Sequence, residues 1–282
     1  MEKKIDLHVH TKASDGIYTP TEMIDYAIAN GISAIAITDH DTVSGLQEAV
    51  QYADKIGFDL IPGIELGIDY PTGSFHLLGL YVDYNNANLI EITEKLKTSR
   101  LIRIKKMVAS LNEYGMDISL DEVEQEASGS AAGKPHIARV MIRKGYAEGI
   151  KDVFKNYLMK GKPGFVERDR ITLSDAVAAI KNAGGIPVVA HPISMNIKTP
   201  AKFEEKLDEL IANGIEGIEV YSSMHSMSEV SEFLKIVDNK NILISGGSDF
   251  HGDKGKQIGV YTDGNFIPSE ILEEIKRYRR SK

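Results

Sequence analysis

The sequence contains no cysteine among its 282 residues. This absence excludes disulfide bonds, thiolate metal ligands and a cysteine nucleophile. Any metal site must therefore be built from histidine, aspartate and glutamate. Such a ligand set suits Mn²⁺, Fe²⁺ or Zn²⁺ better than a structural zinc finger.

Long apolar stretches and an excess of basic charge are also lacking. No apolar run approaches the roughly 18 residues of a membrane span, and the N-terminus lacks the apolar core of a signal peptide, so we expect a cytoplasmic protein without membrane association. The net charge of −8 disfavours general attraction to nucleic acid, and no stable nucleic-acid complex is expected. Bound cations would have to supply positive charge for a phosphate substrate.

Strand-like and helix-like patterns alternate along most of the chain, which is typical of an α/β fold with mostly parallel strands. The expected strands are Ile5–Val9, Ile32–Ile37, Leu60–Glu65, Phe75–Val82, Ile186–Ala190, Ile215–Tyr221 and Ile242–Ser245. A closed (β/α) barrel with about seven strands fits this pattern best. A doubly wound open sheet is the alternative.

One segment lacks strand patterns altogether. Asn88–Tyr114 has the periodicity of a long helix, and Ser119 with Glu122 forms a capping box that starts another. We therefore expect residues 85–165 to form a helical insertion that covers the active-site face. It would separate a first part of the barrel, residues 1–84, from a second part, residues 166–282.

Polar residues gather where the expected strands end. The residues concerned are His10, His40, Glu65, His191 and Asp249. Each alone has an ordinary explanation, such as a loop cap or a salt bridge. Together they favour a multi-metal hydrolase site, because the C-terminal ends of barrel strands form one face that carries the chemistry.

Two short motifs strengthen this interpretation. His8 and His10 lie two residues apart on a strand, so both imidazoles point to the same side, although a solvated strand face would look the same. Asp15 follows in a glycine-containing loop that could bring a carboxylate over the same site. Asp249 and His251 form a second pair flanked by glycines, which allow close approach of backbone or ligand.

The motifs around these residues resemble those of the PHP (polymerase and histidinol phosphatase) family. They are Asp6–Thr11 with Ser14–Gly16, Ile37–Asp41, Gly63–Glu65, His191–Pro192 and Gly247–His251. The resemblance implies a distorted (β/α)₇ barrel, similar to a TIM barrel, with two or three divalent metal ions. It implies nine metal ligands: His8, His10, Asp15, His40, Glu65, His76, His191, Asp249 and His251. Mn²⁺ is the expected ion, and Fe²⁺ or Zn²⁺ could take its place.

Within that family, the chain resembles the stand-alone phosphoesterases. The resemblance implies a substrate that is a nucleotide, including 3′,5′-bisphosphonucleotides, or a short oligonucleotide trimmed from its 5′ end. Histidinol phosphate phosphatase is the nearest competing activity. A metal-dependent C–N hydrolase of the amidohydrolase type is a second competitor, and a non-enzymatic scaffold domain is a third.

The expected mechanism is hydrolysis by a metal-activated hydroxide, with Glu65 as a bridging ligand and Asp249 as both ligand and proton acceptor. Three dications and three carboxylates would leave a charge of about +3, which suits a dianionic phosphate monoester. Candidate substrate-binding residues are His136, Arg139, Lys162 and His225. His136 and Arg139 lie one helical turn apart, and a guanidinium there could bind phosphate through two hydrogen bonds. A solvated helix and a loop histidine are the competing interpretations.

Overall fold

The computed structural model describes residues 3–71, 73–127, 132–167, 170–252 and 255–282. The chain divides into two compact units. The barrel unit comprises Met1–Thr93 and Ile171–Lys282, and the helical unit comprises Glu94–Arg170. None of the helices among the described residues is long and apolar enough to cross a membrane.

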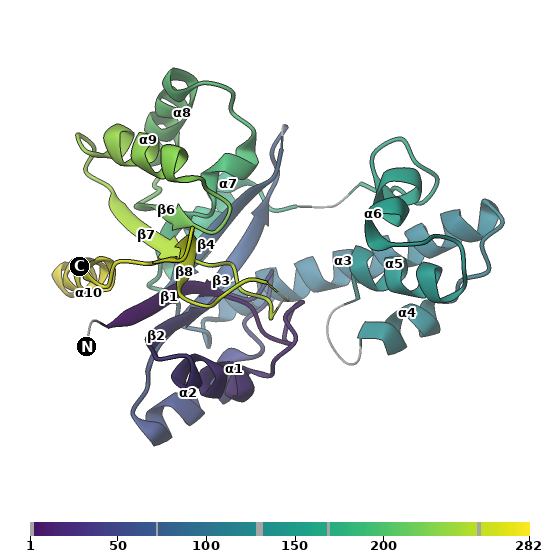
Figure 1. Ribbon diagram of the computed structural model, residues 1–282, viewed down its shortest axis with the longest axis horizontal. Coiled ribbons are helices and arrows are strands. Elements are labelled where there is room, and N and C mark those ends of the chain that lie inside the picture. The colour runs from purple at the N-terminus through teal and green to yellow at the C-terminus, as the bar shows by residue number, and fades with distance from the viewer. Residues whose placement is uncertain (1–2, 72, 128–131, 168–169, 253–254) are drawn as a thin grey trace. The chain divides into compact units, whose positions relative to one another are not determined.

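Seven strands form the sheet of the barrel unit, and they follow one another in chain order (Figure 1). They are β1 (Lys4–Val9), β2 (Ile32–Ile37), β3 (Asp59–Ile68), β4 (Phe75–Leu80), β5 (Ile186–Val189), β6 (Gly217–Ser222) and β7 (Leu243–Gly247). All seven were expected from the sequence. The hairpin of β8 (Val260–Thr262) and β9 (Asn265–Phe266) was not.

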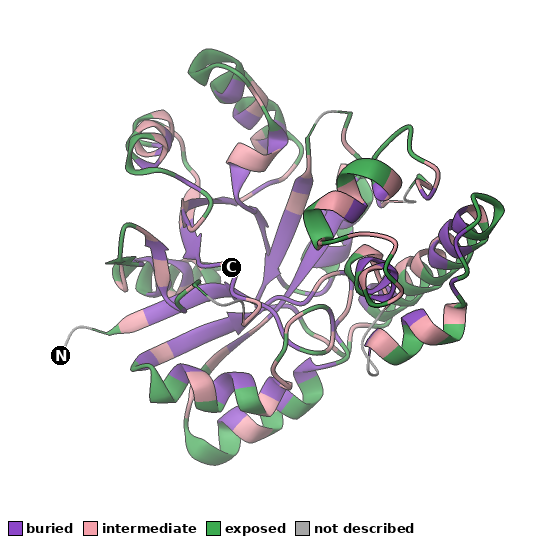
Figure 2. Ribbon diagram, turned by 45° about the vertical axis from the view of Figure 1, so that its right-hand side comes forward, coloured by how far each residue is buried: buried purple, intermediate pink, exposed green. Residues whose placement is uncertain are grey.

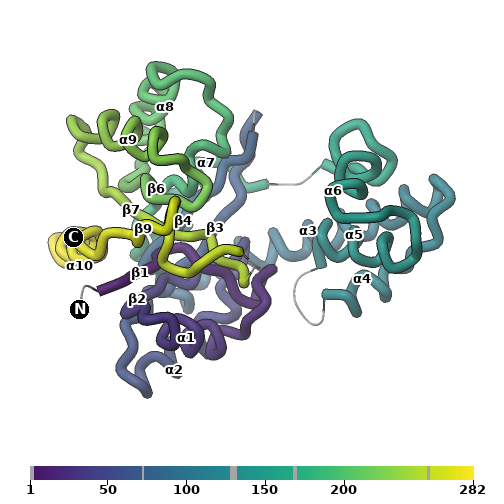
Figure 3. The backbone as a smooth tube through the Cα atoms, in the orientation of Figure 1, coloured from purple at the N-terminus to yellow at the C-terminus, as the bar shows by residue number. Residues whose placement is uncertain are grey.

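The sheet curls into a nearly closed barrel. The loop after β7 bridges to the end of β1, where the His10 backbone N–H donates to the Phe250 carbonyl at 2.9 Å. Figure 3 shows β1 and β7, from opposite ends of the chain, side by side. The predicted (β/α)₇ barrel is therefore confirmed, and the alternative of an open, doubly wound sheet is wrong.

Strand β4 is the exception to parallel pairing. It runs antiparallel to both β3 and β5, whereas the other neighbouring pairs are parallel. The short connection from Ile68 to Phe75 explains this, because parallel neighbours need a crossover of a dozen or more residues. Pairing with β4 also extends β3 to Ile68, so Glu65 lies inside a strand and not at its end as predicted.

Helices cover the outside of the barrel. They are α1 (Pro20–Ala29), α2 (Leu46–Ile56), α7 (Leu173–Asn182), α8 (Pro200–Ala212), α9 (Met227–Val237) and α10 (Glu270–Ser281), with a short 3₁₀ turn at Pro192–Met195. Figure 2 shows buried strands in the centre and exposed residues on the outer sides of these helices. The helix α1 begins as its sequence predicts: the Thr19 hydroxyl accepts from the Glu22 N–H, and the Glu22 carboxylate accepts from the Thr19 N–H.

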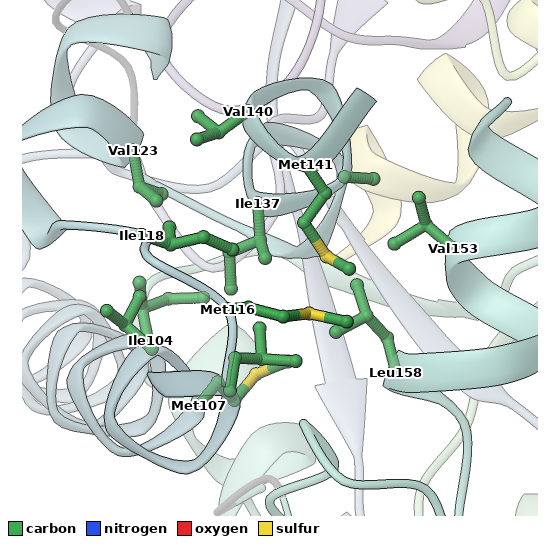
Figure 4. Packing of buried hydrophobic residues seen from close by; sticks show 13 residues of the cluster. Ile104, Met107, Met116, Ile118, Val123, Ile137, Val140, Met141, Val153 and Leu158 are labelled. Carbon is green, nitrogen blue, oxygen red and sulfur yellow. The ribbon is translucent and has the colours of Figure 1, made fainter. Parts of the chain in front are cut away.

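The helical unit has a hydrophobic core of its own (Figure 4). Its elements are α3 (Ala87–Glu113), which begins in the barrel unit, α4 (Leu120–Ala127), α5 (Lys134–Arg143), α6 (Ile150–Val153) and a π-helical turn at Phe154–Leu158. The described residues between 85 and 164 contain helices but no strand, as expected. The predicted limits of the insertion, 85–165, and its predicted position over the active-site face stay predictions.

Candidate metal centre

All nine predicted metal ligands lie in the barrel unit, and the fold brings them together. Three groups of side chains each place their ligand atoms within 4.8 Å of one another. The groups are His10, Asp15, His40 and His251; His8, His10, Glu65 and Asp249; and His40, Glu65 and His76. The ninth residue, His191, joins the cluster through Glu65, since its Nε2 lies 3.1 Å from Glu65 Oε1.

Glu65 lies at the middle of the cluster and is fully buried. Five imidazole nitrogens surround its two oxygens: His8 Nε2 and His10 Nε2 at 3.3 Å, His40 Nδ1 at 2.8 Å, His76 Nδ1 at 2.9 Å, and His191 Nε2 at 3.1 Å. The first three face Oε2 and the last two face Oε1. Each oxygen can therefore serve a different cation, which is the geometry that a bridging carboxylate needs.

Asp249 and Asp15 complete the cluster on the side nearer to solvent. Asp249 Oδ1 lies 3.2 Å from His10 Nε2 and 3.6 Å from both His8 Nε2 and His251 Nδ1. Asp15 Oδ1 lies 3.2 Å from His251 Nε2. Both carboxylates thus face the imidazole of His251, and they come from different loops.

The donor set fits divalent metal ions. Tetrahedral ligands about 2.1 Å from a metal lie roughly 3.4 Å apart, and many of the separations above fall near that value. Within the cluster, four buried atoms have no hydrogen-bond partner among the described residues: His8 Nε2, both ring nitrogens of His10, and Glu65 Oε2. Buried polar atoms without partners are costly. Cations coordinated by these atoms would remove that cost.

The charges within the cluster are strongly coupled. Burial alone would raise the pKa of Glu65, but the imidazoles of His40, His76 and His8 outweigh it and hold that pKa well below its usual range. Burial lowers the pKa of His40, yet Glu65 raises it to about 9. Burial together with repulsion from neighbouring imidazoles lowers the pKa of His10 to about 3. The cluster therefore combines a stabilised anion with a neutral ring, and metal binding would be linked to proton release.

Known proteins resemble this chain over most of its length. The family profile of the PHP domain matches residues 6–167. A 3′,5′-nucleoside bisphosphate phosphatase from Chromobacterium violaceum is 34% identical over 275 residues, which is 96% of each chain.

The chain belongs to the PHP domain family.

A second curated protein and a solved structure also match nearly the whole chain. A 5′-3′ exoribonuclease from Haemophilus influenzae is 31% identical and covers 89% of this chain and 91% of its own. A solved structure from C. violaceum, described as an amidohydrolase with bound sulfate and no metal, has a TM-score of 0.84 at 32% identity. It covers 99% of this chain and 96% of its own.

Buried carboxylates hold the PHP loops that carry the ligands. Asp39 accepts from the Thr11 N–H at 2.7 Å, from the Thr11 hydroxyl at 2.7 Å and from the Ser14 hydroxyl at 2.6 Å. These bonds shape the loop that presents Asp15. The Asp41 carboxylate accepts from the Gly67 N–H at 3.1 Å. Asp39 and Asp41 thus act as loop caps.

Glu219 is a buried neighbour of the cluster that sequence reasoning did not identify. It lies on β6, with one oxygen 3.0 Å from His8 Nδ1 and the other accepting from the His191 N–H at 2.7 Å. A signal was present, since Glu219 is a single carboxylate inside the apolar run Ile218–Val220. Glu65 has the same setting, between Ile64 and Leu66.

Three of the four predicted substrate-binding residues lie in the helical unit. His136 is buried, and its Nδ1 accepts from the Gly133 N–H at 2.9 Å, so it caps the start of α5. Arg139 is partly exposed, and its Nε donates to Glu126 Oε1 at 2.9 Å. Lys162 is exposed and lines a groove beside Tyr114. Their contact with a substrate stays a prediction.

His225 lies in the barrel unit but is 2% exposed. Its Nδ1 donates to the Val220 carbonyl at 2.8 Å, and its ring lies 4.8 Å from that of Phe233. Burial lowers the pKa of His225. This ring is therefore packed within the protein and is not presented at the surface, and its predicted contact with substrate stays a prediction.

Proposed function

We propose that this PHP protein is a metal-dependent phosphoesterase that hydrolyses a phosphate monoester of a nucleotide or a short oligonucleotide. The 5′-phosphate and the 3′,5′-bisphosphonucleotide are the substrate types in question. The observation that carries the proposal is the convergence of six imidazoles and three carboxylates around Glu65. Such a cluster is suited to phosphate chemistry, because metal ions bound there can stabilise both the attacking and the leaving oxygen.

The relatives support the same substrate class. One of them is a nucleoside bisphosphate phosphatase and another is a 5′-3′ exoribonuclease, so both act on phosphate esters of nucleotides. The solved structure from C. violaceum holds sulfate, a tetrahedral anion like phosphate. The net charge of −8 makes a small phosphorylated substrate a better candidate than a long nucleic acid.

We propose two or three divalent ions, with Mn²⁺ as the physiological metal and Fe²⁺ or Zn²⁺ as substitutes. When bound, such ions lower the pKa of coordinated water and neutralise phosphate oxygens. Glu65, whose two oxygens both face imidazoles, would be the ligand that two ions share. Asp249 would hold an ion through Oδ1, which faces the imidazoles, and would accept the proton that the attacking water loses.

The rest of the reaction is an in-line displacement. The water oxygen forms a bond to phosphorus while the ester bond to the leaving oxygen breaks. Arg139 is proposed to contribute to phosphate binding, since its partner Glu126 also pairs with Arg143 and the guanidinium is 44% exposed. His136, Lys162 and His225 are the other proposed substrate-binding residues.

The decisive experiment is a substrate screen of protein stripped of metal and reconstituted with Mn²⁺. The panel contains a 3′,5′-bisphosphonucleotide, a 5′-phosphorylated oligonucleotide and histidinol phosphate, with released phosphate as the readout. A parallel assay for ammonia release from amide substrates tests the C–N hydrolase alternative, which the amidohydrolase from C. violaceum raises.

We expect phosphate release from one or both nucleotide substrates and none after chelation. A preference for histidinol phosphate would replace the nucleotide proposal with the competing phosphatase activity. Ammonia release without phosphate release would contradict the phosphoesterase proposal. Near-zero metal content with no activity on any substrate would favour a scaffold domain.

A further inference from the structure

Glu219 lies on β6 and contacts two of the predicted metal ligands. They are His8, on β1, and His191, just after β5. Its Oε1 lies 3.0 Å from His8 Nδ1, and its Oε2 accepts from the His191 backbone N–H at 2.7 Å. The side chains of Glu219 and His8 are fully buried. Neither oxygen of Glu219 lies among the three groups of candidate metal-binding atoms. This carboxylate therefore contacts predicted ligands without being a candidate ligand itself.

We propose that Glu219 is a positioning residue that sets the metal affinity of the cluster by fixing the tautomer of His8 and the backbone of His191. The inference rests on the metal-dependent function proposed above. Carboxylates that accept from the second nitrogen of a metal-binding imidazole orient the ring and increase its basicity.

The tautomer of His8 decides whether it can bind a metal. Its Nε2 lies 3.3 Å from Glu65 and 3.6 Å from Asp249, so Nε2 is the nitrogen that faces the cluster. A neutral imidazole carries one proton, and the nitrogen without it is the ligand. Because the Nδ1–H group donates a hydrogen bond to Glu219, the proton of the neutral ring stays on Nδ1 and Nε2 keeps its lone pair for the metal.

Only a side chain with two acceptor oxygens satisfies both partners of Glu219. A glutamine has one acceptor and one donor group at its end. If its oxygen faces the His191 N–H, its amide donates to His8 Nδ1 and the proton of His8 moves to Nε2, which blocks metal binding. If its oxygen faces His8 instead, the amide and the His191 N–H are two donors that oppose each other.

The backbone around Glu219 is built to keep these contacts short. His191 has φ +23°, a conformation that L residues rarely adopt, and its N–H bond to Glu219 holds it there. Gly247 approaches from β7, where an added Cβ would lie 2.1 Å from His8 Cβ and 2.7 Å from Glu219 Oε1. A glycine is therefore required at this position to let the carboxylate and the imidazole meet.

The test compares Glu219→Gln with the parent protein by calorimetric titration of Mn²⁺ into metal-free protein, with no substrate present. We expect the variant to bind Mn²⁺ about 10- to 100-fold more weakly while circular dichroism shows the parent fold. Glu216→Gln is the matched control, because Glu216 lies three positions earlier and pairs with Lys181 and Lys282. Parent-like Mn²⁺ affinity in Glu219→Gln would overturn the proposal.

Two further measurements separate positioning from a direct catalytic role and from a failure of folding. Turnover of Glu219→Gln should recover as the Mn²⁺ concentration is raised, since the defect acts through metal occupancy. Turnover that stays low at saturating Mn²⁺ would contradict the positioning role.

In the parent protein loaded with Zn²⁺, ¹⁵N spectra should show His8 protonated at Nδ1. A proton on Nε2 would exclude the proposed role even if the variant does not fold. A parent protein that binds Mn²⁺ tightly but hydrolyses no phosphate ester would count against the proposed function alone.

Discussion

The carboxylate of Asp6 accepts a hydrogen bond of 2.9 Å from the backbone N–H of Ser248, and it also accepts from the Ser248 hydroxyl. This contact ties the first strand to the loop that carries Asp249. The same carboxylate accepts from the N–H groups of His8 at 3.2 Å and Gly259 at 2.7 Å. Burial raises the pKa of Asp6 to about 6 despite these four donors.

Replacing Asp6 with asparagine should lower the free energy of unfolding by about 2 to 4 kcal/mol at pH 7.5, because the amide group would face buried donors and leave them without an acceptor. Urea denaturation of the metal-free protein measures the change. Asp25→Asn is the control, since Asp25 is exposed and accepts a hydrogen bond from the Tyr52 hydroxyl at the surface, and it should change stability by less than about 0.5 kcal/mol. Equal effects of the two substitutions would show that the contacts of Asp6 contribute little.

Replacing Asp249 with alanine should abolish phosphate release while the fold is retained. The carboxylate lies 3.2 Å from His10 and 3.6 Å from His8, so its removal takes away one ligand from a shared site. Chelation of the parent protein should have the same effect, and Mn²⁺ should restore activity to the parent but not to the variant. Full activity of the remetallated variant would contradict the metal mechanism.

Replacing Arg139 with alanine should raise KM by more than it lowers kcat, because a phosphate-binding guanidinium contributes equally to the ground state and the transition state. Arg143→Ala is the matched control, since Arg143 pairs with the same partner, Glu126. Steady-state kinetics with the best nucleotide substrate separates the two parameters. Identical changes in both variants would assign Arg139 to the pairing of α4 with α5, and not to the substrate.

Tyr81 should make stability depend on pH above 10. Its hydroxyl is buried with no hydrogen-bond partner among the described residues, and burial raises the pKa of Tyr81 to about 12. In the unfolded chain the same phenol loses its proton near pH 10. The contribution of this pKa difference to the free energy of unfolding is therefore fully present below pH 10 and is lost as the pH rises through 12. The loss is at most about 3 kcal/mol.

The substitution Tyr81→Phe tests whether ionisation of this phenol lowers the stability between pH 10 and pH 12. The variant should be at least as stable as the parent at pH 8, because it lacks a buried hydroxyl without a partner in the described part of the chain, and its advantage should grow between pH 10 and pH 12, as measured by denaturation at a series of pH values. Packing against Arg279, which lies 4.4 Å from the ring centroid, needs no hydroxyl and should be retained. Parallel stability curves for the two proteins would show that the phenol does not titrate as described.

Much of the candidate metal centre could be predicted because its signals are local. His8 and His10 point to one side of a strand for reasons of backbone geometry alone, and His40 and His191 follow apolar strands directly. The position of His76 in the cluster nevertheless depends on the antiparallel pairing of β4 with β3. An antiparallel β4 begins at the same edge where its neighbours end, and this brings His76 to Glu65.

The types of ligand, the alternation that builds a barrel and the separate helical segment follow from the order of residues, because hydrophobic periodicity and residue chemistry can be read position by position. Three contacts depend on the folded chain: Glu219 meets His8 across 211 positions, Glu126 pairs with Arg139, and His225 is buried. These contacts depend on how distant strands and helices pack. A short stretch of sequence carries no record of which partner the folded chain will place opposite a given side chain.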